Sequence, residues 1–483
     1  MFYTASIVAL AALSLCIVYR NRVYAAYASL KFLVNGRRML IEAAEKHKDA
    51  PFSMLIPGNR LHVVSSKEHW NDLNSTSINH LSSHAWSKQH FQPKYTFGYE
   101  WADRRDVDGM PVVRAVRTMT NRFPELKQKF IGIMSEELDQ AFKANILSNG
   151  SSKIPLWDTV KHFGSRINML MMFGEDVANN PFTVDRGLKY IDETTLVGEA
   201  AKNLPTWLIP IAAWLIRGNN ENQKHILDTI ASETQKYYDA LAFTPENAHR
   251  KPKSILEALV QNLPEEKYGG RIRFDMNTTF ISSTTATPIM ATQLLEDIYT
   301  HPEYLPALRE EVKGVLDDPS ANMTNLPLLE SFLVESIRTH CFLATVIHRV
   351  PLRSYTFSDG YTVPAGEIVE FYQHKVMSDN SIYRDAKKFD PERFKGTGKT
   401  SCDMGMEWPF WGNSKLACPG RFHVTNVAKL IAVYFVMNYD AHFERTDNLS
   451  FQFRDVNVPN PAAKLILERR ESNLEERQTN TES

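Results

Sequence analysis

The chain has 483 residues, and its 55 lysines and arginines nearly balance 56 aspartates and glutamates, which leaves a formal net charge of −1. This balance gives no reason to expect a nucleic-acid partner. Charged residues make up 23% and apolar residues 43% of the chain, as in a globular protein with a large core. The four cysteines have no C-x-x-C spacing, so we expect neither a disulfide framework nor a four-cysteine zinc site.

The chain begins with MFYTASIVALAALSLCIVYR, an uncharged run of about 18 residues that is long enough to span a bilayer. A cleaved signal peptide is the alternative, but its charge would precede the apolar run rather than follow it. We therefore expect residues 1–22 to be a single-pass anchor. Residues 23–470 would form one large domain in the cytosol, because positive flanks tend to stay there. The polar stretch 471–483 is expected to be disordered.

Between these ends the pattern is mainly helical with short strands. The segments 53–66 and 349–366 carry β-branched residues around Pro-Gly and Asp-Gly turns, which predicts small antiparallel pieces. No internal repeat or long linker divides the chain, so we expect a single mainly α domain with a small β region. Apolar residues recur at helical spacing over 124–146, 157–173, 221–243, 274–299, 303–316, 326–339 and 421–437.

One apolar stretch in the middle of the chain stands apart. LPTWLIPIAAWLI (204–216) is too short to span a bilayer and is interrupted by Pro205 and Pro210. Its two tryptophans suit a loop that dips into a bilayer, and a buried connection between helices is the alternative.

Two charged elements follow toward the C-terminus. ESFLVESIRTH places Glu335 and Arg338 three residues apart on one face of a helix, among apolar residues that would bury them. KKFDPERF (387–394) adds Arg393, which can complete a buried charge triad with that pair.

The last chemical feature is a lone cysteine in WPFWGNSKLACPGRFH (408–423). Cys418 precedes Pro419-Gly420 and an apolar helical run, so it lies near a helix N-terminus, where N–H groups and the helix dipole stabilise a thiolate. No base lies beside it in the sequence, so it suits an axial iron ligand better than a nucleophile. A structural buried cysteine remains the alternative on these residues alone.

WGNSKLACPGRF resembles the cysteine-ligand loop of cytochrome P450, F-G-x-G-[RK]-[HR]-x-C-P-G-R. It departs in having Trp411 for the phenylalanine, Ser414 for the second glycine and Leu416 for a basic residue. Glu335-x-x-Arg338 and the PERF around Arg393 resemble the family's two upstream elements, in the same order. The resemblance covers most of the chain, and HFQPKYTFGYEWADRR is similar to fungal members of terpenoid and alkaloid pathways.

This resemblance implies the cytochrome P450 fold, with residues 23–470 as a haem-thiolate catalytic domain anchored in the endoplasmic reticulum membrane and facing the cytosol. It implies haem b (heme b, iron protoporphyrin IX), with Cys418 as the iron ligand, and a monooxygenase supplied with electrons by NADPH-cytochrome P450 reductase. The substrate would be a hydrophobic secondary metabolite, such as a terpenoid, steroid or alkaloid.

The family also suggests roles for further residues. Arg349 and Arg114 match contacts to the haem propionates, although Arg114 is as readily an ordinary surface arginine. Lys415 would share this task because Leu416 cannot. Trp411 is expected to stack near the sulfur, and the charge triad is expected to lie beneath the haem.

The helix that activates oxygen in this family departs most from its pattern, [AG]-G-x-[DE]-T-[TS]. Here FISSTTATPIMATQ places Ala286 at the threonine position, Thr285 at the acid position and Thr287 after them; a shift of one residue would make Thr285 the threonine. Thr284, Thr285 and Thr287 are the candidates for organising water, and the alternative is that they bond to helix carbonyls. Pro288 is expected to kink the helix where oxygen binds.

This departure keeps other functions open. One alternative is a haem enzyme that performs desaturation, cyclisation or rearrangement without net hydroxylation, and another is a non-catalytic haem- or ligand-binding protein. The segment 341–349 places five apolar residues where the family's strand lines the substrate pocket, which suggests a large apolar ligand. These residues are Phe342, Leu343, Ala344, Val346 and Ile347.

Overall fold

The structure is a computed structural model that describes residues 27–48, 50–99, 111–243, 250–263, 265–321, 323–413 and 416–470. The predicted anchor (1–22) and the polar tail (471–483) lie outside these ranges. Within the ranges, no helix combines the length and the apolar character needed to cross a membrane.

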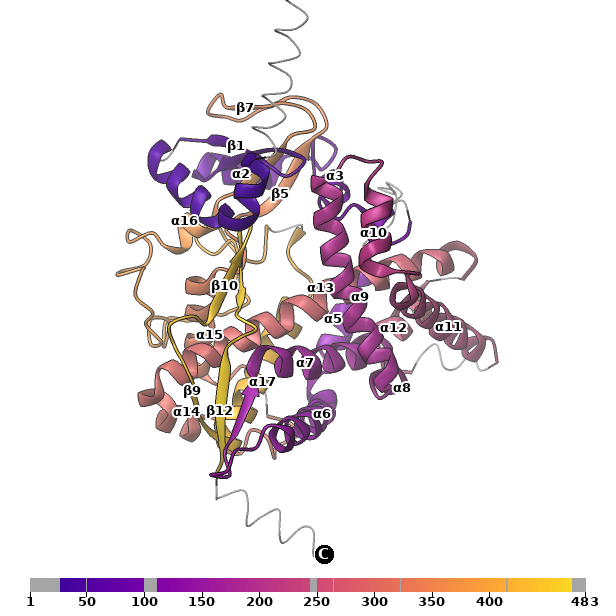
Figure 1. The fold of residues 1–483 in the computed structure, drawn as a ribbon, viewed down its shortest axis with the longest axis vertical. Coiled ribbons are helices and arrows are strands. Elements are labelled where there is room, and N and C mark those ends of the chain that lie inside the picture. The colour runs from indigo at the N-terminus through magenta and orange to yellow at the C-terminus, as the bar shows by residue number, and fades with distance from the viewer. Residues whose placement is uncertain are drawn as a thin grey trace, which may run out of the picture.

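Helices dominate the described chain, as the sequence predicts (Figure 1). After a helix over residues 27–47 they are α2 (Lys67–Ser75), α3 (Ser83–Phe91), α4 (Pro93–Thr96), α5 (Pro111–Thr120), α6 (Phe123–Ala144), α7 (Leu156–Phe173), α8 (Glu175–Ala178), α9 (Pro181–Asn203), α10 (Ile209–Arg217), α11 (Glu221–Phe243), α12 (Ile255–Asn262), α13 (Glu265–Thr300), η2 (Pro302–Tyr304), α14 (Leu305–Glu311), α15 (Pro327–His340), α16 (Gln373–Met377) and α17 (Arg421–Asn438).

Most predicted helical ranges agree with these bounds to within a few residues at most ends, although α13 begins nine residues before the predicted 274. The range 303–316 is the exception, because its helix stops at Glu311. Gly314 follows with a φ of +76°, a left-handed conformation that a continuing right-handed helix does not adopt.

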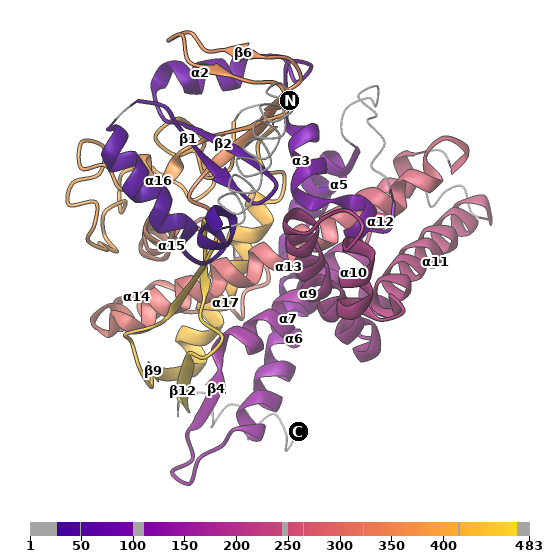
Figure 2. The same cartoon turned by 45° about the horizontal axis from the view of Figure 1, so that its top comes forward.

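Strands gather at one end of the molecule and along the C-terminal part of the chain (Figures 1 and 2). They are β1 (Phe52–Ile56), β2 (Asn59–Val64), β3 (Leu81–Ser82), β4 (Ser152–Pro155), β5 (Val346–Pro351), β6 (Tyr355–Thr356), β7 (Thr362–Val363), β8 (Ile368–Phe371), β9 (Tyr439–Phe443), β10 (Ser450–Phe453), β11 (Val456–Pro459) and β12 (Lys464–Arg469).

The main sheet has the strand order β1-β2-β8-β5-β3, and β4-β12-β9 forms a second sheet. The predicted pieces are the antiparallel pair β1–β2 and the antiparallel pair β6–β7. The sequence did not predict β8, which pairs in parallel with β2 about 300 residues away, because its partner is not local. Alternate residues of β2 and β8 enter two small cores on opposite faces of this sheet.

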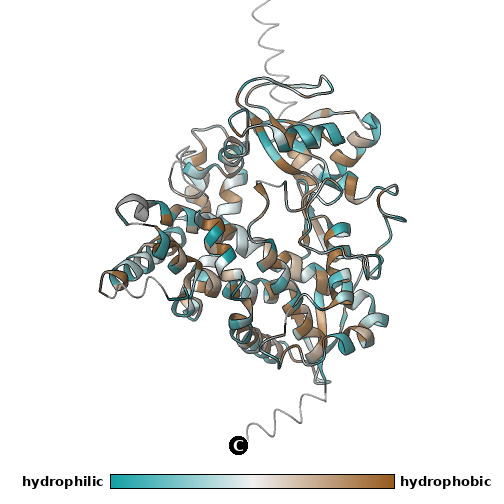
Figure 3. Ribbon diagram, turned by 180° about the vertical axis from the view of Figure 1, so that it is seen from behind, coloured by the Kyte–Doolittle hydropathy of each residue, from teal (hydrophilic) through white to brown (hydrophobic). Residues whose placement is uncertain are grey.

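The large core surrounds α13, which crosses the middle of the molecule and packs mainly against α7 and α17 (Figure 1). Peripheral helices carry both hydrophobic and hydrophilic residues along their length, as amphipathic helices do (Figure 3). Pro288 lies inside α13, and the helix continues through it to Thr300. This arrangement brings α13, α15 and the segment before α17 into one central region.

The segment 204–216 is not a buried connection. Trp207, Trp214 and Leu215 are 71%, 62% and 71% exposed, so that alternative is wrong. The helix α10 is held from its C-terminal end, where Arg217 donates hydrogen bonds to the carbonyl oxygens of Tyr95 (2.9 Å) and Thr96 (2.7 Å). The apolar side chains of α10 therefore face outward on a fixed helix.

Candidate active site

Cys418 lies at the end of a tight loop that leads into α17. Its N–H donates to the carbonyl oxygen of Trp411 at 2.8 Å, which closes the loop. Gly412 has a φ of +88°, and a Cβ there would lie 3.2 Å from the Leu416 carbonyl oxygen, so a glycine fits this turn. Lys415, a predicted propionate contact, lies outside the described residues.

The electrostatics of Cys418 correct part of the sequence-based expectation. The N–H groups of Gly420 and Arg421 and the charge of Arg421 lower the pKa of its thiol, as predicted for a helix N-terminus. Burial has the larger effect and raises that pKa overall. The helix end by itself does not produce a thiolate; a cation bound to the sulfur would, and this is the donor chemistry of a metal ligand.

Trp411 is buried beside this loop. Its indole N–H donates to the Ser401 carbonyl oxygen at 2.6 Å, and its ring meets Phe410 edge-on at 4.7 Å. The indole hydrogen is therefore donated away from Cys418, and the expected position of Trp411 near the sulfur stays a prediction. Trp411 instead ties the cysteine loop to the preceding segment.

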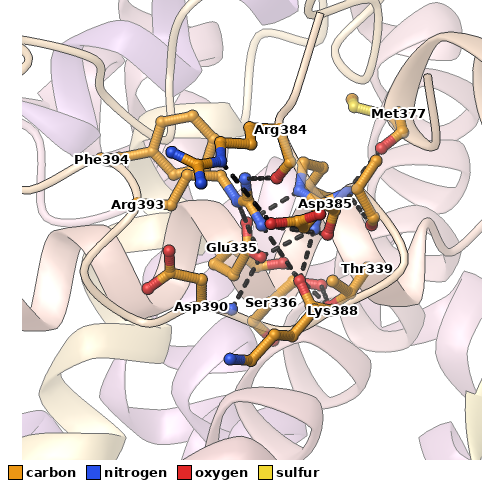
Figure 4. A network of polar contacts seen from close by, with 12 residues as sticks. Glu335, Ser336, Thr339, Met377, Arg384, Asp385, Lys388, Asp390, Arg393 and Phe394 are labelled. Carbon is orange, nitrogen blue, oxygen red and sulfur yellow. Dashed lines mark hydrogen bonds and ion pairs between the residues drawn. The ribbon is translucent and has the colours of Figure 1, made fainter. Parts of the chain in front are cut away.

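The predicted charge triad is confirmed as a set of contacts (Figure 4). The fully buried Glu335 receives two 2.7 Å hydrogen bonds from Arg338 and two 3.1 Å hydrogen bonds from Arg393. The N–H of Asp390 adds a fifth at 2.9 Å. Arg338 also donates to the carbonyl oxygens of Met377 and Ala386 at 2.6 and 2.7 Å. One carboxylate thus fastens the segment 384–394 to α15.

Arg349 on β5 is a buried cation that fits an anionic group. It donates to the carbonyl oxygen of His348 (2.8 Å) and to Asn413 Oδ1 (3.3 Å). Burial lowers its pKa to about 10, and among the residues that the structure describes no carboxylate pairs with it. A haem propionate would supply the missing charge. Arg114 lies on α5 with an exposed side chain, and its propionate role stays a prediction.

His348, next to Arg349, is a half-buried histidine with its own partners. Its Nδ1 lies 2.9 Å from Glu370, and its ring stacks on Trp86 at 4.1 Å. His90 stacks on the other side of Trp86 at 4.5 Å. Sequence analysis missed this sandwich because His348 comes from β5, far along the chain from Trp86 and His90 of α3.

The three candidate threonines of α13 do not share one environment. Thr284 and Thr287 are buried, and their hydroxyl oxygens have no hydrogen-bond partner within the described part of the chain. Thr285 is half-buried and donates to the Ile281 carbonyl oxygen at 2.9 Å, which is the alternative that the sequence left open.

Pro288 lies on the buried side of α13 with Thr284. A Cβ on Gly164 of α7 would lie 3.2 Å from the Pro288 ring, so the ring packs against α7. Proline has no N–H, so the Thr284 carbonyl loses its helix partner on this buried side. We expected Pro288 to kink α13 where oxygen binds. Because its ring lies against α7, Pro288 would act on that site only through the shape of the helix.

Sequence analysis also missed a buried bridge between three helices. Asn168 of α7 donates to the Ser283 carbonyl oxygen of α13 at 2.9 Å, and its Oδ1 lies 2.9 Å from His423 Nε2 of α17. Burial lowers the pKa of His423 to about 4, so the ring is neutral near pH 7. The bridge connects the helix that follows Cys418 to the middle of α13.

Three residues of the segment predicted to line the pocket lie in the cores of the main sheet instead. Ala344, Val346 and Ile347 are buried in the two small cores of the main sheet. Phe342 and Leu343 are half-buried and keep surface for a ligand.

A groove of about 840 Å³ lies on the outer side of the cysteine loop. Arg117 of α5, Leu416 and Pro419 of the loop, and Arg421 and Phe422 of α17 are among its lining residues. Phe422 is 45% exposed and lies beside Arg421, so the groove offers an apolar contact next to a cation, four residues after Cys418 in the chain.

Comparisons with known proteins agree with this geometry. The family model of cytochrome P450 matches residues 102–466. A cytochrome P450 monooxygenase of Penicillium paxilli, paxP, is 24% identical over 459 residues, which cover 89% of this chain and 85% of that protein. TerQ of Tolypocladium album, named a cytochrome P450 monooxygenase, is 24% identical over 78% of this chain and 74% of its own length.

Solved structures agree on the fold. A retinoic-acid-bound cyanobacterial protein, CYP120A1, superposes with a TM-score of 0.70 over 92% of this chain and 96% of its own, at 16% sequence identity. The match over residues 102–466, with Cys418 at the start of α17 and Glu335 between its two arginines, shows that this chain belongs to the cytochrome P450 family, whose members are monooxygenases that use haem b.

Proposed function

We propose that the protein is a membrane-associated monooxygenase of fungal secondary metabolism that oxidises a hydrophobic terpenoid, steroid or alkaloid. The observation that carries this proposal is the position of Cys418, whose sulfur meets the N–H groups of Gly420 and Arg421 at the start of α17. The fungal sources of the relatives support the pathway class.

Three groups of residues would hold haem b and the loop around it. Cys418 would bind the iron, and Arg349 would pair with a propionate, together with Arg114 and Lys415. Glu335, Arg338 and Arg393 hold the segment before the cysteine loop in place. When bound, the haem supplies oxygen activation, which electron donation from the thiolate favours.

Proton delivery would differ from the family pattern. Ala286 has no hydroxyl, and Thr285 stands where the family has an acid. Thr285 is half-buried but donates its hydrogen to the Ile281 carbonyl oxygen, so its oxygen is free only to accept. A group on the substrate or a water would then supply the proton. The same departure favours desaturation, cyclisation or rearrangement as the second candidate function.

The groove beside the cysteine loop suits the electron-donating partner, NADPH-cytochrome P450 reductase. Its arginines, Arg117 and Arg421, would complement an acidic surface, and the exposed Phe422 would provide an apolar contact. The groove borders the loop that holds Cys418, so an electron would have a short path to the iron.

The exposed side chains of α10 support contact with a membrane. Trp207, Trp214 and Leu215 form an apolar surface with Ile211, and tryptophan is favoured at the interface between lipid and water. Tyr27, Leu30 and Val34 are also exposed, on the helix that follows the predicted anchor. Together these surfaces would keep the domain on the endoplasmic reticulum membrane and admit a hydrophobic substrate.

The spectrum of the reduced, carbon-monoxide-bound protein tests the proposal. We expect a strongly red-shifted Soret band from a thiolate ligand, and a histidine-type band at shorter wavelength in Cys418→His. Cys402→Ser is the matched control, because Cys402 is a second cysteine whose sulfur lies 3.2 Å from Thr425 Oγ1. A histidine-type band or no haem in the native protein contradicts the proposal.

Product analysis with the reductase and candidate terpenoids separates the remaining candidates. A hydroxylated product supports the leading function, and a dehydrogenated or cyclised product supports the second. Consumption of NADPH without an organic product means that dioxygen is reduced to peroxide or water, whereas neither consumption nor product favours a non-catalytic ligand-binding protein.

A further inference from the structure

Trp86 of α3 lies between two imidazole rings, and we call Trp86, His90 and His348 the tryptophan stack. The centroid of the His348 ring is 4.1 Å from that of Trp86 at an interplanar angle of 10°, and the centroid of the His90 ring is 4.5 Å away at 19°. The stack forms where α3 packs against β5 of the main sheet (Figure 1). Both faces of the indole are covered, so a polar partner can reach it only at its edge.

The edge of the indole meets a buried carboxylate. Its N–H donates to Glu370 Oε1 at 3.0 Å. Glu370 is 7% exposed, and its other oxygen accepts a hydrogen bond from Thr345 Oγ1 at 2.5 Å. Burial raises the pKa of Glu370, but His348, Thr345 and Trp86 lower it by more, so the carboxylate is ionised near pH 7. The indole N–H therefore points at a fixed negative charge.

This hydrogen bond distinguishes Trp86 from the other tryptophans that the structure describes. Trp411 donates to a backbone carbonyl oxygen, and Trp408 has no acceptor within the described ranges. Trp70 is half-buried and meets Phe371 of β8 edge-on at 5.2 Å. Among the described tryptophans, Trp86 alone donates to a carboxylate.

A carboxylate at the indole N–H makes the indole easier to oxidise. Loss of one electron leaves a positive charge on the ring and makes the N–H acidic. A negative charge beside the N–H stabilises this cation and can take its proton, as preorganised groups stabilise charge that develops during a reaction. The effect is larger in a buried site, because water screens the charges less there.

The cations near the stack are paired or neutralised. Burial, together with the charges of Lys202 and Arg454, lowers the pKa of His90 well below its ordinary value, so this ring is neutral near pH 7. Lys202 and Arg454 both contact the carboxylate of Glu199, at 2.9 Å for Arg454. A positive charge on Trp86 would therefore meet a neutral ring on the His90 side and Glu370 at its edge.

The stack also lies next to the predicted haem contact. His348 directly precedes Arg349, the buried cation that would pair with a haem propionate. His348 thus connects Trp86 to the residue that would hold the edge of the porphyrin.

We propose that Trp86 is an internal electron donor to the haem and that Glu370 accepts the indole proton in the same step. This inference goes beyond the proposed function and rests on it, because a bound haem oxidised by dioxygen or peroxide is the oxidant. One electron passes from the indole to this haem, the N–H bond breaks, and its proton forms an O–H bond on Glu370. An electron from the reductase or from a thiol in solution later restores the indole, and the proton returns. The step would consume oxidising equivalents that no substrate has used.

Electron paramagnetic resonance of the haem-loaded, substrate-free protein tests the inference. The probe is hydrogen peroxide, mixed with the protein and frozen within milliseconds. We expect an organic radical whose signal narrows when the protein is made with ring-deuterated tryptophan. Trp86→Phe should remove most of this signal. Trp70→Phe is the matched control and should keep it, because Trp70 also packs against the main sheet but does not donate to a carboxylate.

Glu370→Gln tests the role of the carboxylate. Glutamine keeps an acceptor of nearly the same shape but cannot take the proton. The yield of radical should fall about tenfold, the worth of one charge-assisted hydrogen bond. The carbon monoxide spectrum of each variant shows whether the haem is still bound, and the native protein and Trp86→Phe decide the inference even if Glu370→Gln loads no haem.

A native protein that forms no tryptophan radical overturns the inference. A radical of undiminished yield in Trp86→Phe overturns it too, and so does an undiminished yield in haem-loaded Glu370→Gln. The carbon monoxide spectrum keeps the two proposals apart. A thiolate-type band without the radical removes only this inference, whereas the absence of that band removes the proposed function as well.

Discussion

Two buried glutamates show how differently the two sides of the central core are built. Glu335 on α15 is 0% exposed and receives five hydrogen bonds, from Arg338, Arg393 and the N–H of Asp390. Glu296 on α13 is 2% exposed, and neither of its carboxyl oxygens has a partner among the described residues. Burial raises the pKa of Glu296 to about 8.

The two glutamates thus mark two kinds of surroundings. Glu335 belongs to a network of paired charges, whereas Glu296 lies on a helix that carries buried polar groups without partners. Around Glu335, the charges are matched and they fix the segment 384–394 to α15. Along α13, Glu296, Thr284 and Thr287 all have side-chain oxygens without partners in the part of the chain that the structure describes. Such groups are costly when buried, so these positions of α13 lack the compensation that stabilises the surroundings of Glu335.

Removing Glu335 is expected to have the largest effect. Glu335→Ala leaves Arg338 and Arg393 buried without their counter-charge, at a cost of about 3–5 kcal/mol. We expect the variant to lose haem-loaded protein rather than to change its products. Haem content per protein and the urea midpoint measure this.

Glu392→Ala is the control for Glu335→Ala. Glu392 lies in the same segment but is half exposed in its pair with Lys395 at 3.0 Å, and should change stability by less than about 1 kcal/mol. Normal haem content in Glu335→Ala, with altered products, would show that the triad is not a structural support.

Glu296 should make stability depend on pH. The folded protein keeps its proton up to about pH 8, whereas the unfolded chain loses it above the ordinary pKa of 4.5. The folded state therefore binds more protons in this window, and stability falls as the pH rises through it. By pH 7 the loss is on the order of 3 kcal/mol.

Glu296→Gln should remove this loss, because the amide cannot ionise. Urea unfolding of both proteins at about pH 5, 7 and 8.5 compares their slopes. Burial lowers the pKa of the nearby His340, but Asp297 at 3.1 Å and Glu296 raise it overall, so replacing Glu296 also shifts His340 and the two slopes report both groups. Parallel pH profiles would mean that Glu296 has a partner in solution.

The same contrast explains what the sequence could predict. The charge triad could be predicted because Glu335, Arg338 and Arg393 belong to short motifs that are recognisable in the sequence. The amphipathic helices could be predicted from local periodicity. The burial of Glu296 and the bridge of Asn168 to Ser283 and His423 depend on which helix faces meet, and a single sequence does not encode that locally. Ala286 showed that the helix departs from the family pattern, but not that Thr284 and Thr287 are buried while Thr285 is half-buried.

Replacing Asn168 tests the connection between the two regions. We expect the replacement to lower the free energy of unfolding by about 1–3 kcal/mol. Asn168→Leu keeps the volume but leaves His423 Nε2 and the Ser283 carbonyl without the side chain that each contacts at 2.9 Å. Replacing both partners, in Asn168→Leu/His423→Phe, should recover most of the loss, because no unpaired imidazole remains. A double variant no more stable than Asn168→Leu would show that the bridge contributes through its shape alone.

The smallest effect is expected within the cysteine side itself, where two buried tryptophans differ in one hydrogen bond. Trp411 donates its indole N–H to the Ser401 carbonyl oxygen at 2.6 Å. Trp408 is also buried, and its N–H has no acceptor within the described ranges. Changing either to Phe removes similar ring area, so the difference between the two variants isolates the hydrogen bond. Trp411→Phe should be less stable than Trp408→Phe by about 1 kcal/mol in urea unfolding, because Ser401 loses a donor only in the first.

Since Trp411 does not donate to Cys418, its Phe variant should also keep the position of the carbon monoxide Soret band. A shifted band in Trp411→Phe alone would mean that the indole acts on the sulfur after all, and that the cysteine loop is tuned rather than only held.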